Sequence, residues 1–155
     1  MAFKMVFLPE NVTDEWIRRV REAAPGCDAR LVKSNQAALK EIVDADAAYG
    51  TVTPELLGAA KKLRWIQAPA AAPPIGYYHQ PLIESPVIVT NQRGIYNDHL
   101  AAHIMSFVLA FARGLHAYIP RQLQRDWKQG VEPIHLPDCA ALIIGVGGAG
   151  AETAR

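Results

Sequence analysis

The stretch Ala141-Leu142-Ile143-Ile144-Gly145-Val146-Gly147-Gly148-Ala149-Gly150 decides the fold of the last part of this 155-residue chain. An apolar run leads into a G-x-G-x-x-G turn, and the residues after the turn favour a helix start. In such a turn the first glycine permits the tight bend, the second lets the backbone approach a pyrophosphate, and the third lets the helix pack on the strand. The N–H groups at the start of the helix then face the phosphate. We predict that the cofactor-binding residues are Gly145, Val146, Gly147, Gly148, Ala149 and Gly150, with NAD or NADP as the cofactor.

A glycine-rich turn without a ligand is the alternative interpretation. The acidic residue that binds the ribose is expected roughly 20 residues after the motif, and the sequence given ends at Arg155. NAD and NADP therefore stay open as alternatives. The helix from Gly148 has at most eight residues, and isolated helices below about 12–15 residues are marginal in water. The predicted strand 139–144 also has hydrogen-bonding edges that need partners. We expect a poorly preorganised phosphate site in these 155 residues alone.

Upstream of the glycine turn, short apolar runs alternate with helix signals. Thr13 can cap a helix over 14–24, and Thr53-Pro54 is a strong start for a helix over 55–63. The remaining predicted elements are a helix over 36–43 and strands over 4–8, 29–33, 47–50, 64–67 and 87–90. Strands that alternate with helices imply crossover connections. We therefore predict an α/β fold with a mainly parallel sheet and helices on both of its faces.

The segment Ala68-Pro69-Ala70-Ala71-Ala72-Pro73-Pro74-Ile75-Gly76 separates the last two of these strands. Its recurring prolines exclude a regular helix. It follows the carboxyl end of a strand, which is where open α/β sheets bind ligands. An ordinary connecting loop fits the spacing equally well.

Two helices are expected between the sheet and the glycine turn. The segment 98–115 is apolar on most of its surface, so we expect it to be buried on nearly all sides. The segment 118–129 carries three basic residues and Trp127. We expect a domain change near Asn97, with a first domain over 1–97 and a second over 98–155.

Composition excludes several classes of protein. Half of the residues are hydrophobic and the net charge is +1, which is typical of a globular domain without an electrostatic footprint for nucleic acid or an anionic membrane. Cys27 and Cys139 lack metal-ligand spacing and are expected to be reduced thiols. The start of the chain is too quickly interrupted for a signal peptide. The apolar stretch 100–112 is shorter than the roughly 20 residues of a membrane span. We expect a cytoplasmic protein with no nucleic-acid or membrane partner.

Further motifs occur in a definite order along nearly the whole chain. They are Leu63-Arg64-Trp65-Ile66-Gln67, Val89-Thr90-Asn91-Gln92-Arg93-Gly94-Ile95-Tyr96-Asn97, Ala102-His103, Leu109-Ala110-Phe111-Ala112-Arg113, Gln124 with Trp127, and the glycine turn. In this order and spacing the chain resembles the front portion of the NAD-dependent D-2-hydroxyacid dehydrogenases, the group that includes phosphoglycerate dehydrogenase and formate dehydrogenase. Several motifs together are far more specific than any one of them.

The resemblance implies two α/β domains, a flavodoxin-like substrate domain that is partial here and the start of a Rossmann-like cofactor domain. It implies hydride transfer between the nicotinamide and a small 2-hydroxy or 2-oxo acid. The family's catalytic arginine, glutamate and histidine have no counterpart in these 155 residues, so we predict no catalytic residue and no hydride transfer by this polypeptide alone. A homodimer through the helices of 98–129 is also implied.

The resemblance further implies that backbone N–H groups of the loop after the fourth strand hold the substrate carboxylate. The candidate substrate-binding residues are Ala70, Ala71, Ala72 and Asn97. In place of the usual serine and glycine of this loop stand Ala68 and Ala72. Prolines follow them and donate no N–H, so the carboxylate site is expected to be reshaped and the substrate to be unusual. Asn97 is equally suited to cap a helix.

The other polar candidates have simpler interpretations. His99 and His103 lie four residues apart, but Leu100 stands where a zinc site of the His-Glu-x-x-His type needs glutamate, so no metal is predicted. His79, His116 and His135 are interpreted as solvated. Arg93 is interpreted as a surface residue, with a contact to an acid substrate as the alternative. Tyr77, Tyr78 and Tyr96 are interpreted as packing residues, with closure over a substrate as the alternative. Two hypotheses stay open: the leading half of a hydroxyacid dehydrogenase, and a non-catalytic binding or interaction module derived from one.

Overall fold

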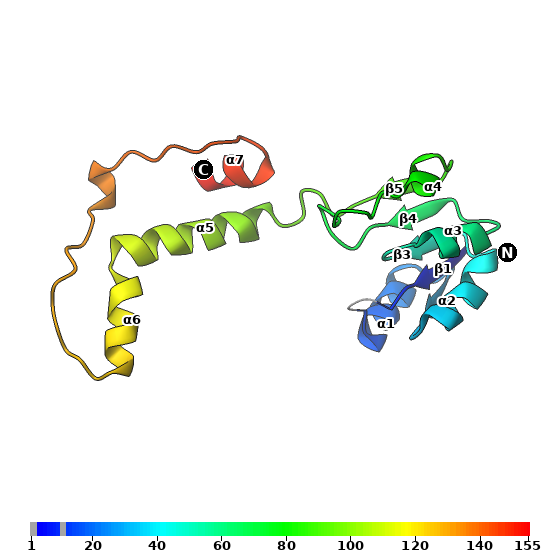
Figure 1. Cartoon of the computed structure of the whole chain (residues 1–155), viewed down its shortest axis with the longest axis horizontal. Helices are drawn as coiled ribbons and strands as arrows, with labels where there is room; N and C mark the ends of the chain where they lie inside the picture. The colour runs from blue at the N-terminus through cyan, green and yellow to red at the C-terminus, as the bar shows by residue number, and fades with distance from the viewer. Residues whose placement is uncertain (1–2, 10–11) are drawn as a thin grey trace. The chain divides into compact units, whose positions relative to one another are not determined.

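The structure is a computed structural model that describes residues 3–9 and 12–155. The chain divides into two compact units, residues 1–93 and residues 94–155. Each unit is described by itself (Figure 1).

The first unit contains a five-stranded sheet in which every strand pairing is parallel. The strands are β1 (Phe3–Phe7), β2 (Cys27–Leu31), β3 (Ala47–Tyr49), β4 (Trp65–Gln67) and β5 (Ile88–Thr90), in the order β2-β1-β3-β4-β5. The predicted α/β class with a parallel sheet is confirmed. The predicted strand 29–33 begins two residues too late, because the parallel register pairs Phe3 with Cys27.

Four short α-helices connect the strands: α1 (Asp14–Ala23), α2 (Asn35–Glu41), α3 (Pro54–Ala59) and α4 (Gln80–Ile83). A 3-10 turn, η1 (Ile42–Asp44), continues α2. The predicted caps are confirmed: Oγ1 of Thr13 and of Thr53 each accept a backbone N–H three residues on, at 3.3 Å. The predicted extension of α3 to residue 63 is wrong, since Ala60 is extended and Lys61 N donates to Val43 O at 3.1 Å.

The sheet has an apolar core on each face, which explains why helices cover both (Figure 1). Along β1 the side chains alternate, so that Val6 joins one cluster while Met5 and Phe7 join the other. The first cluster packs beneath α2, α3 and α4 and includes Ile66, which is fully buried. The second packs beneath α1 through Ile17. Strands buried on both faces are typical of parallel sheets.

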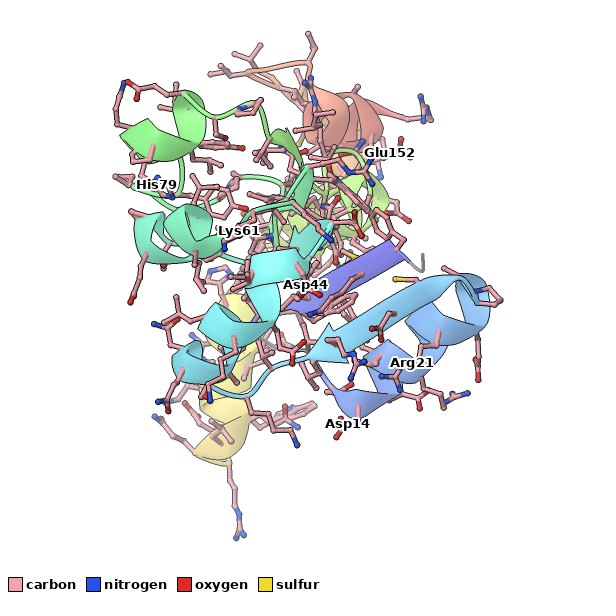
Figure 2. The ribbon with its side chains drawn as sticks, turned by 90° about the vertical axis from the view of Figure 1, so that its right-hand side faces the viewer. Asp14, Arg21, Asp44, Lys61, His79 and Glu152 are labelled. Carbon is pink, nitrogen blue, oxygen red and sulfur yellow. The ribbon has the colours of Figure 1, made fainter. Side chains whose placement is uncertain are left out.

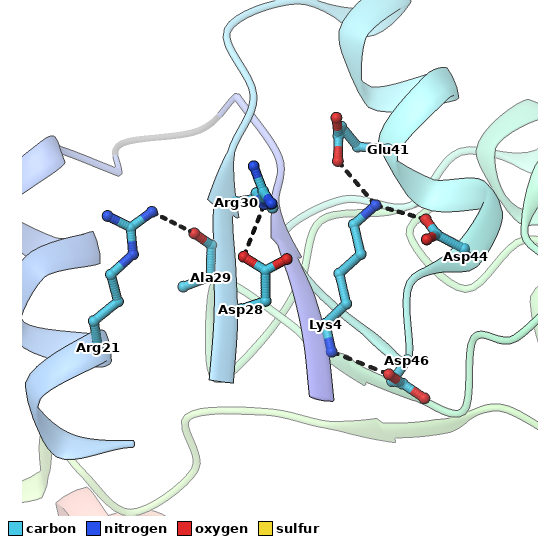
Figure 3. Close-up of polar contacts among 8 residues, drawn as sticks. All are labelled: Lys4, Arg21, Asp28, Ala29, Arg30, Glu41, Asp44 and Asp46. Atoms are coloured by element: carbon cyan, nitrogen blue, oxygen red, sulfur yellow. Dashed lines mark hydrogen bonds and ion pairs between the residues drawn. The ribbon is translucent and has the colours of Figure 1, made fainter. Parts of the chain in front are cut away.

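Lys4 joins β1 to the region around η1 (Figure 3). Its ammonium group pairs with Glu41 at 2.9 Å and with Asp44 at 2.6 Å, and its backbone N–H donates to Oδ2 of Asp46 at 3.0 Å. Burial lowers the pKa of Lys4, but the hydrogen bonds to Asp44 and Glu41 outweigh it, and the pKa is raised. The hydrogen bond from Lys4 lowers the pKa of Asp44 below its ordinary value. Both shifts indicate that the charged pair is favoured in the folded state.

The second unit contains α5 (Asn97–Ala112), α6 (Leu115–Leu123), a 3-10 turn η2 (Leu136–Asp138) and α7 (Gly148–Ala154). The helix boundaries predicted here are wrong. Gly114 takes a left-handed conformation with φ of 69°, which ends the first helix, and α6 begins directly after it. Arg125 is also left-handed, with φ of 55°, and follows the end of α6 at Leu123.

Two further predictions for this unit are wrong. Residues 139–144 do not form a strand, and Leu142 and Ile144 are 87% and 92% exposed. A strand needs a neighbour for its N–H and C=O groups, and the described residues of this unit contain no second strand to pair with it. Helix α5 is not buried on nearly all sides. Within this unit α7 packs along it, but only Ala101 and Ala112 of the helix are buried.

Within the described part of the chain, no single helix is both long and apolar enough to cross a membrane. Only α5 and α6 taken together, with a bend of 72° between them, pass the same criterion of length and composition.

Candidate functional site

The loop after β4 is anchored at its far end to the segment that follows β3. The hydroxyl of the buried Tyr77 donates to Gly50 O at 3.0 Å. Nε2 of His79 lies 2.9 Å from Val52 O, and Nδ1 accepts the N–H of Leu82 at 3.2 Å. Because Nδ1 is an acceptor, Nε2 carries the hydrogen and donates to the carbonyl. His79 is therefore a half-buried cap at the start of α4 (Figure 2), and its interpretation as a solvated histidine is wrong.

The near end of the loop is held by polar side chains on β4 and β5. Nε1 of Trp65 donates to Oγ1 of Thr90 at 2.7 Å, and that hydroxyl donates to Oε1 of Gln67 at 2.7 Å. The same Gln67 donates through Nε2 to Ala68 O at 3.0 Å. Ala68 N also donates to Thr90 O at 2.7 Å, which extends the ladder by one bond. The loop thus leaves the sheet in a fixed direction.

Between these anchors lie the three predicted substrate-binding alanines of the loop. Pro69, Pro73 and Pro74 have no N–H, so the donors of this stretch are Ala70, Ala71 and Ala72. In the described residues, 3–9 and 12–155, none of these three N–H groups has a hydrogen-bond acceptor. Ala71 and Ala72 are exposed and Ala70 is half-buried. The loop therefore presents a run of three backbone donors at the carboxyl edge of the sheet.

Asn91 is a residue of this region to which the sequence analysis assigned no role. Its Nδ2 donates to Ala71 O at 2.9 Å, and its Oδ1 accepts Arg93 N at 3.1 Å. Two sequence signals were its place in the family-like motif Val89–Asn97 and its position directly after β5, since β4 and β5 are neighbours whose carboxyl ends meet.

The glycine turn in the second unit has the conformations that its glycines permit. Gly145 has φ of 102°, which a side chain would strain. A Cβ on Gly150 would lie 1.9 Å from Gly145 O, so no side chain fits there. A Cβ on Gly147 would have no atom within 4 Å, and its φ of −69° is unstrained. The turn is thus closed at Gly150 and open at Gly147, where a phosphate approaches in dinucleotide sites.

Asn97 is the first residue of α5, and the N-cap position before it belongs to Tyr96. The suggestion that Asn97 caps the helix is therefore wrong. Its carboxamide instead lies against Gly148, at the first residue of α7, where a Cβ would be 2.5 Å from Nδ2. The structure thus brings Asn97 next to the glycine turn, whereas Ala70–Ala72 lie beside Asn91 in the other unit.

The remaining polar candidates have packing partners. The ring of His103 lies edge-on to Phe107 at 4.9 Å, and the ring of His99 lies 6.2 Å from that of Tyr96. In the described part of the chain, no group of three or more His, Cys, Asp or Glu side chains could hold a metal ion.

A surface groove of about 540 Å³ between α1 and β2 is lined by three arginines. Arg18 pairs with Glu15 and Glu22, Arg21 donates to Ala29 O at 2.7 Å, and Arg30 pairs with Asp28 at 2.8 Å (Figure 3 shows the last two). Each guanidinium group thus has a partner within the chain. The groove is not a strong candidate for binding an anion.

No protein-family model matches the sequence, and no curated protein matches it. Solved structures match almost the whole chain and give it the α/β fold of the D-isomer-specific 2-hydroxyacid dehydrogenases, as the sequence motifs led us to expect. A family protein of that description from Aeromonas salmonicida subsp. salmonicida superposes with a TM-score of 0.81 and 23% identity, over 98% of this chain and 49% of that one.

Two further solved structures show the same fold. The D-lactate dehydrogenase of Aquifex aeolicus, solved with NAD and lactic acid, has a TM-score of 0.70 and 16% identity, over 97% of this chain and 46% of that chain. An NADPH-dependent glyoxylate/hydroxypyruvate reductase of Sinorhizobium meliloti, solved with citrate, has a TM-score of 0.73 and 19% identity, over 100% of this chain and 50% of that chain. The chain spans about half the length of each of these structures.

Proposed function

We propose that this chain is the leading part of an NAD(P)-dependent oxidoreductase that transfers a hydride to or from a small 2-hydroxy or 2-oxo acid. The observation that carries the proposal is the fit of the glycine turn: Gly145 takes a conformation reserved for glycine, Gly150 has no room for a Cβ, and Gly147 faces open space. The fold supports it, since a dehydrogenase solved with NAD and lactic acid and a reductase described as NADPH-dependent share it.

In this proposal the residues Gly145–Gly150 hold the pyrophosphate of NAD or NADP through backbone N–H groups. The bound cofactor supplies or accepts the hydride. Asn97, whose carboxamide contacts Gly148, is proposed as a further contact to the substrate. The amides of Ala70, Ala71 and Ala72 bind the carboxylate of the acid, because they are backbone donors without a partner in the described chain and none of the three residues is fully buried. Two prolines follow Ala72, so the acid is expected to be held by fewer loop amides than a loop without prolines offers.

The groups that exchange a proton with the substrate are proposed to lie outside these 155 residues. The catalytic arginine, glutamate and histidine that the family resemblance implies have no counterpart in these 155 residues. The purified chain should therefore not oxidise NADH in the presence of pyruvate or glyoxylate. Turnover that survives repurification of the chain would contradict this part of the proposal.

Heteronuclear NMR on the 155-residue chain tests the cofactor site. We expect NADH to shift the amide resonances of Gly145–Gly150, with weak affinity because the turn is followed by a helix of only seven residues. The variant Gly147→Ala should abolish these shifts without changing the fold, since a methyl group there meets nothing but would stand where the phosphate approaches. Gly26→Ala, also without a neighbour within 4 Å, is the matched control and should leave the shifts intact.

Two outcomes of that titration would contradict the proposal. Shifts that persist in Gly147→Ala would mean that the phosphate does not approach the turn at that glycine. Tight binding of NADH by the wild-type chain would contradict our expectation that its phosphate site is poorly preorganised.

A second copy of the chain is the proposed partner of the α5–α6 region. Apolar side chains of α5, α6 and the segment after them are strongly exposed, including Phe107 at 54%, Phe111 at 59%, Leu123 at 83% and Trp127 at 97%. So many exposed large apolar side chains on neighbouring elements favour association. Light scattering should find a dimer whose dissociation constant rises in Leu123→Asp. A monomer at all concentrations would contradict a homodimer.

The same exposed surface favours a second candidate function, a non-catalytic interaction module. The mass of the protein isolated from its source discriminates the two functions. A natural protein of 155 residues that binds a partner protein but no NADH supports the module. A longer protein that oxidises a 2-hydroxy acid excludes it.

A further inference from the structure

Asn91 uses one end of its carboxamide to hold the candidate carboxylate loop and the other end to hold the backbone of its own segment after β5. Nδ2 donates to Ala71 O at 2.9 Å, across 20 residues of sequence, and Oδ1 accepts Arg93 N at 3.1 Å. The second bond fixes the plane of the carboxamide relative to its own backbone. The direction of the bond from Nδ2 to Ala71 O is therefore fixed, because the carboxamide cannot rotate without breaking the bond from Arg93 N to Oδ1.

Holding one carbonyl oxygen also orients the N–H group next to it. The described chain has no cis peptide bond, so the C=O of Ala71 and the N–H of Ala72 point in opposite directions across one planar unit. With Ala71 O turned toward Asn91, Ala72 N–H must face away from Asn91. No other described group binds Ala71 O or Ala72 N, so nothing else fixes the rotation of this peptide.

The orientation of this one peptide matters because the loop has few donors. Pro69 and Pro73 frame the stretch and leave three N–H groups, those of Ala70, Ala71 and Ala72. Pro73 also restricts Ala72 to extended conformations. Rotation of the Ala71–Ala72 peptide would replace the last of these donors with a carbonyl oxygen, which repels an anion.

We propose that Asn91 is a positioning residue that fixes the Ala71–Ala72 peptide so that the Ala72 N–H stays available to the carboxylate of a 2-oxo acid. This inference rests on the proposed function of the loop. Asn91 itself contacts no ligand in this arrangement. It acts through the peptide that it holds.

The variant Asn91→Asp tests the inference with a minimal change. The aspartate keeps an oxygen that accepts Arg93 N but loses the donor and repels Ala71 O. In the variant without ligand, the residual dipolar coupling of the Ala72 N–H should change and its order parameter should fall from about 0.85 to below about 0.6. Asn35→Asp is the matched control, because Asn35 is exposed and its side chain has no hydrogen bond within the described chain.

Titration with sodium pyruvate measures the effect on the ligand. In the wild-type chain the amide resonances of Ala70–Ala72 should shift, and Asn91→Asp should raise the dissociation constant by about tenfold, a loss equivalent to one charge-assisted hydrogen bond. The melting temperature should change little, since Asn91 is exposed. Asn91→Ala, which adds no charge, should weaken pyruvate binding in the same direction.

The outcomes separate this inference from the proposed function. Unchanged Ala72 couplings in Asn91→Asp would overturn the positioning role whether or not pyruvate binds. Changed Ala72 couplings with an unchanged pyruvate affinity would show that Asn91 does not contribute to ligand binding. The proposed carboxylate site itself would not be contradicted. No pyruvate shift in the wild-type chain would overturn the carboxylate site and with it the ligand role of Asn91, while the couplings still decide whether Asn91 fixes the peptide.

Discussion

The carboxamide of Asn97 lies so close to Gly148 that a Cβ at position 148 would stand 2.5 Å from Nδ2 and 2.6 Å from Oδ1. A residue at the start of α5 and a residue of the glycine turn thus share one contact. The contact leaves no room for a Cβ at 148, although that position is one of the two variable residues between the second and third glycines of the motif.

Gly148→Ala should move the Asn97 side chain without unfolding the unit. The obstructing atoms are the end of a flexible side chain, and alanine is favoured over glycine in a helix by about 0.5–1 kcal/mol. These effects oppose each other, so the unfolding free energy should change by less than about 1 kcal/mol, while the side-chain amide resonances of Asn97 shift. Gly58→Ala in α3 is the control, because alanine is favoured in the helix and its Cβ would have no atom within 4 Å. It should stabilise the protein by about 0.5–1 kcal/mol. Unshifted Asn97 resonances would contradict the contact.

Gly150→Ala should displace α7, in contrast to Gly147→Ala. The new Cβ would lie 1.9 Å from Gly145 O, a backbone atom held in a turn that only glycine adopts easily. Moving that backbone costs about 1–3 kcal/mol, which is large for a seven-residue helix. Hydrogen exchange of the amides of residues 151–154 should accelerate in Gly150→Ala and stay unchanged in Gly147→Ala. Equal exchange in both variants would refute the steric argument.

How well the fold was predicted depended on whether the deciding contact was local. Thr13 and Thr53 cap their helices through a backbone N–H three residues away, and both caps were predicted from sequence. The end of α3 was not, because it depends on a bond from Lys61 N to Val43 O across 18 residues. The strand expected at 139–144 failed for a similar reason, since apolar residues become a strand only where another strand pairs with them.

The features of the candidate site were also predictable only where they depend on neighbouring residues in the sequence. The positive φ of Gly145 and the lack of space at Gly150 follow from motif spacing alone. The roles of Asn91 and His79 do not, because each depends on a carbonyl oxygen 20 or 27 residues away. Only the topology brings those carbonyls to the carboxyl edge of the sheet, where neighbouring parallel strands end together.

Tyr77→Phe should destabilise the anchor of the loop after β4. The hydroxyl donates to Gly50 O at 3.0 Å in a buried position, and a lost hydrogen bond of this kind costs about 0.5–1.5 kcal/mol. Urea unfolding of the two proteins measures the difference. Tyr78→Phe is the control, because Tyr78 is 48% exposed and its hydroxyl has no hydrogen bond within the described chain. Equal stability of Tyr77→Phe and the wild-type chain would show that the hydroxyl contributes nothing.

The pairing of Asp44 with Lys4 should make the free energy of unfolding depend on pH in the acid range, which is called the acid limb below. The hydrogen bond from Lys4 lowers the pKa of Asp44 from its ordinary value of 3.8. A carboxyl group with a lowered folded pKa stabilises the protein above its unfolded pKa and loses that contribution as the pH falls through the folded pKa. The wild-type unfolding free energy should therefore decline below pH 3.8, and Asp44→Asn should remove part of that decline.

Urea unfolding between about pH 5 and about pH 2 measures this acid limb. The difference between Asp44→Asn and the wild-type chain is attributed to the pairing with Lys4, because Lys4 is largely buried and its amino group contacts both Asp44 and Glu41. Glu132→Gln removes a carboxylate that has no ion pair within the described chain, and its acid limb should match that of the wild-type chain. Parallel pH profiles for Asp44→Asn and the wild-type chain would mean that the Lys4–Asp44 bond does not persist in solution.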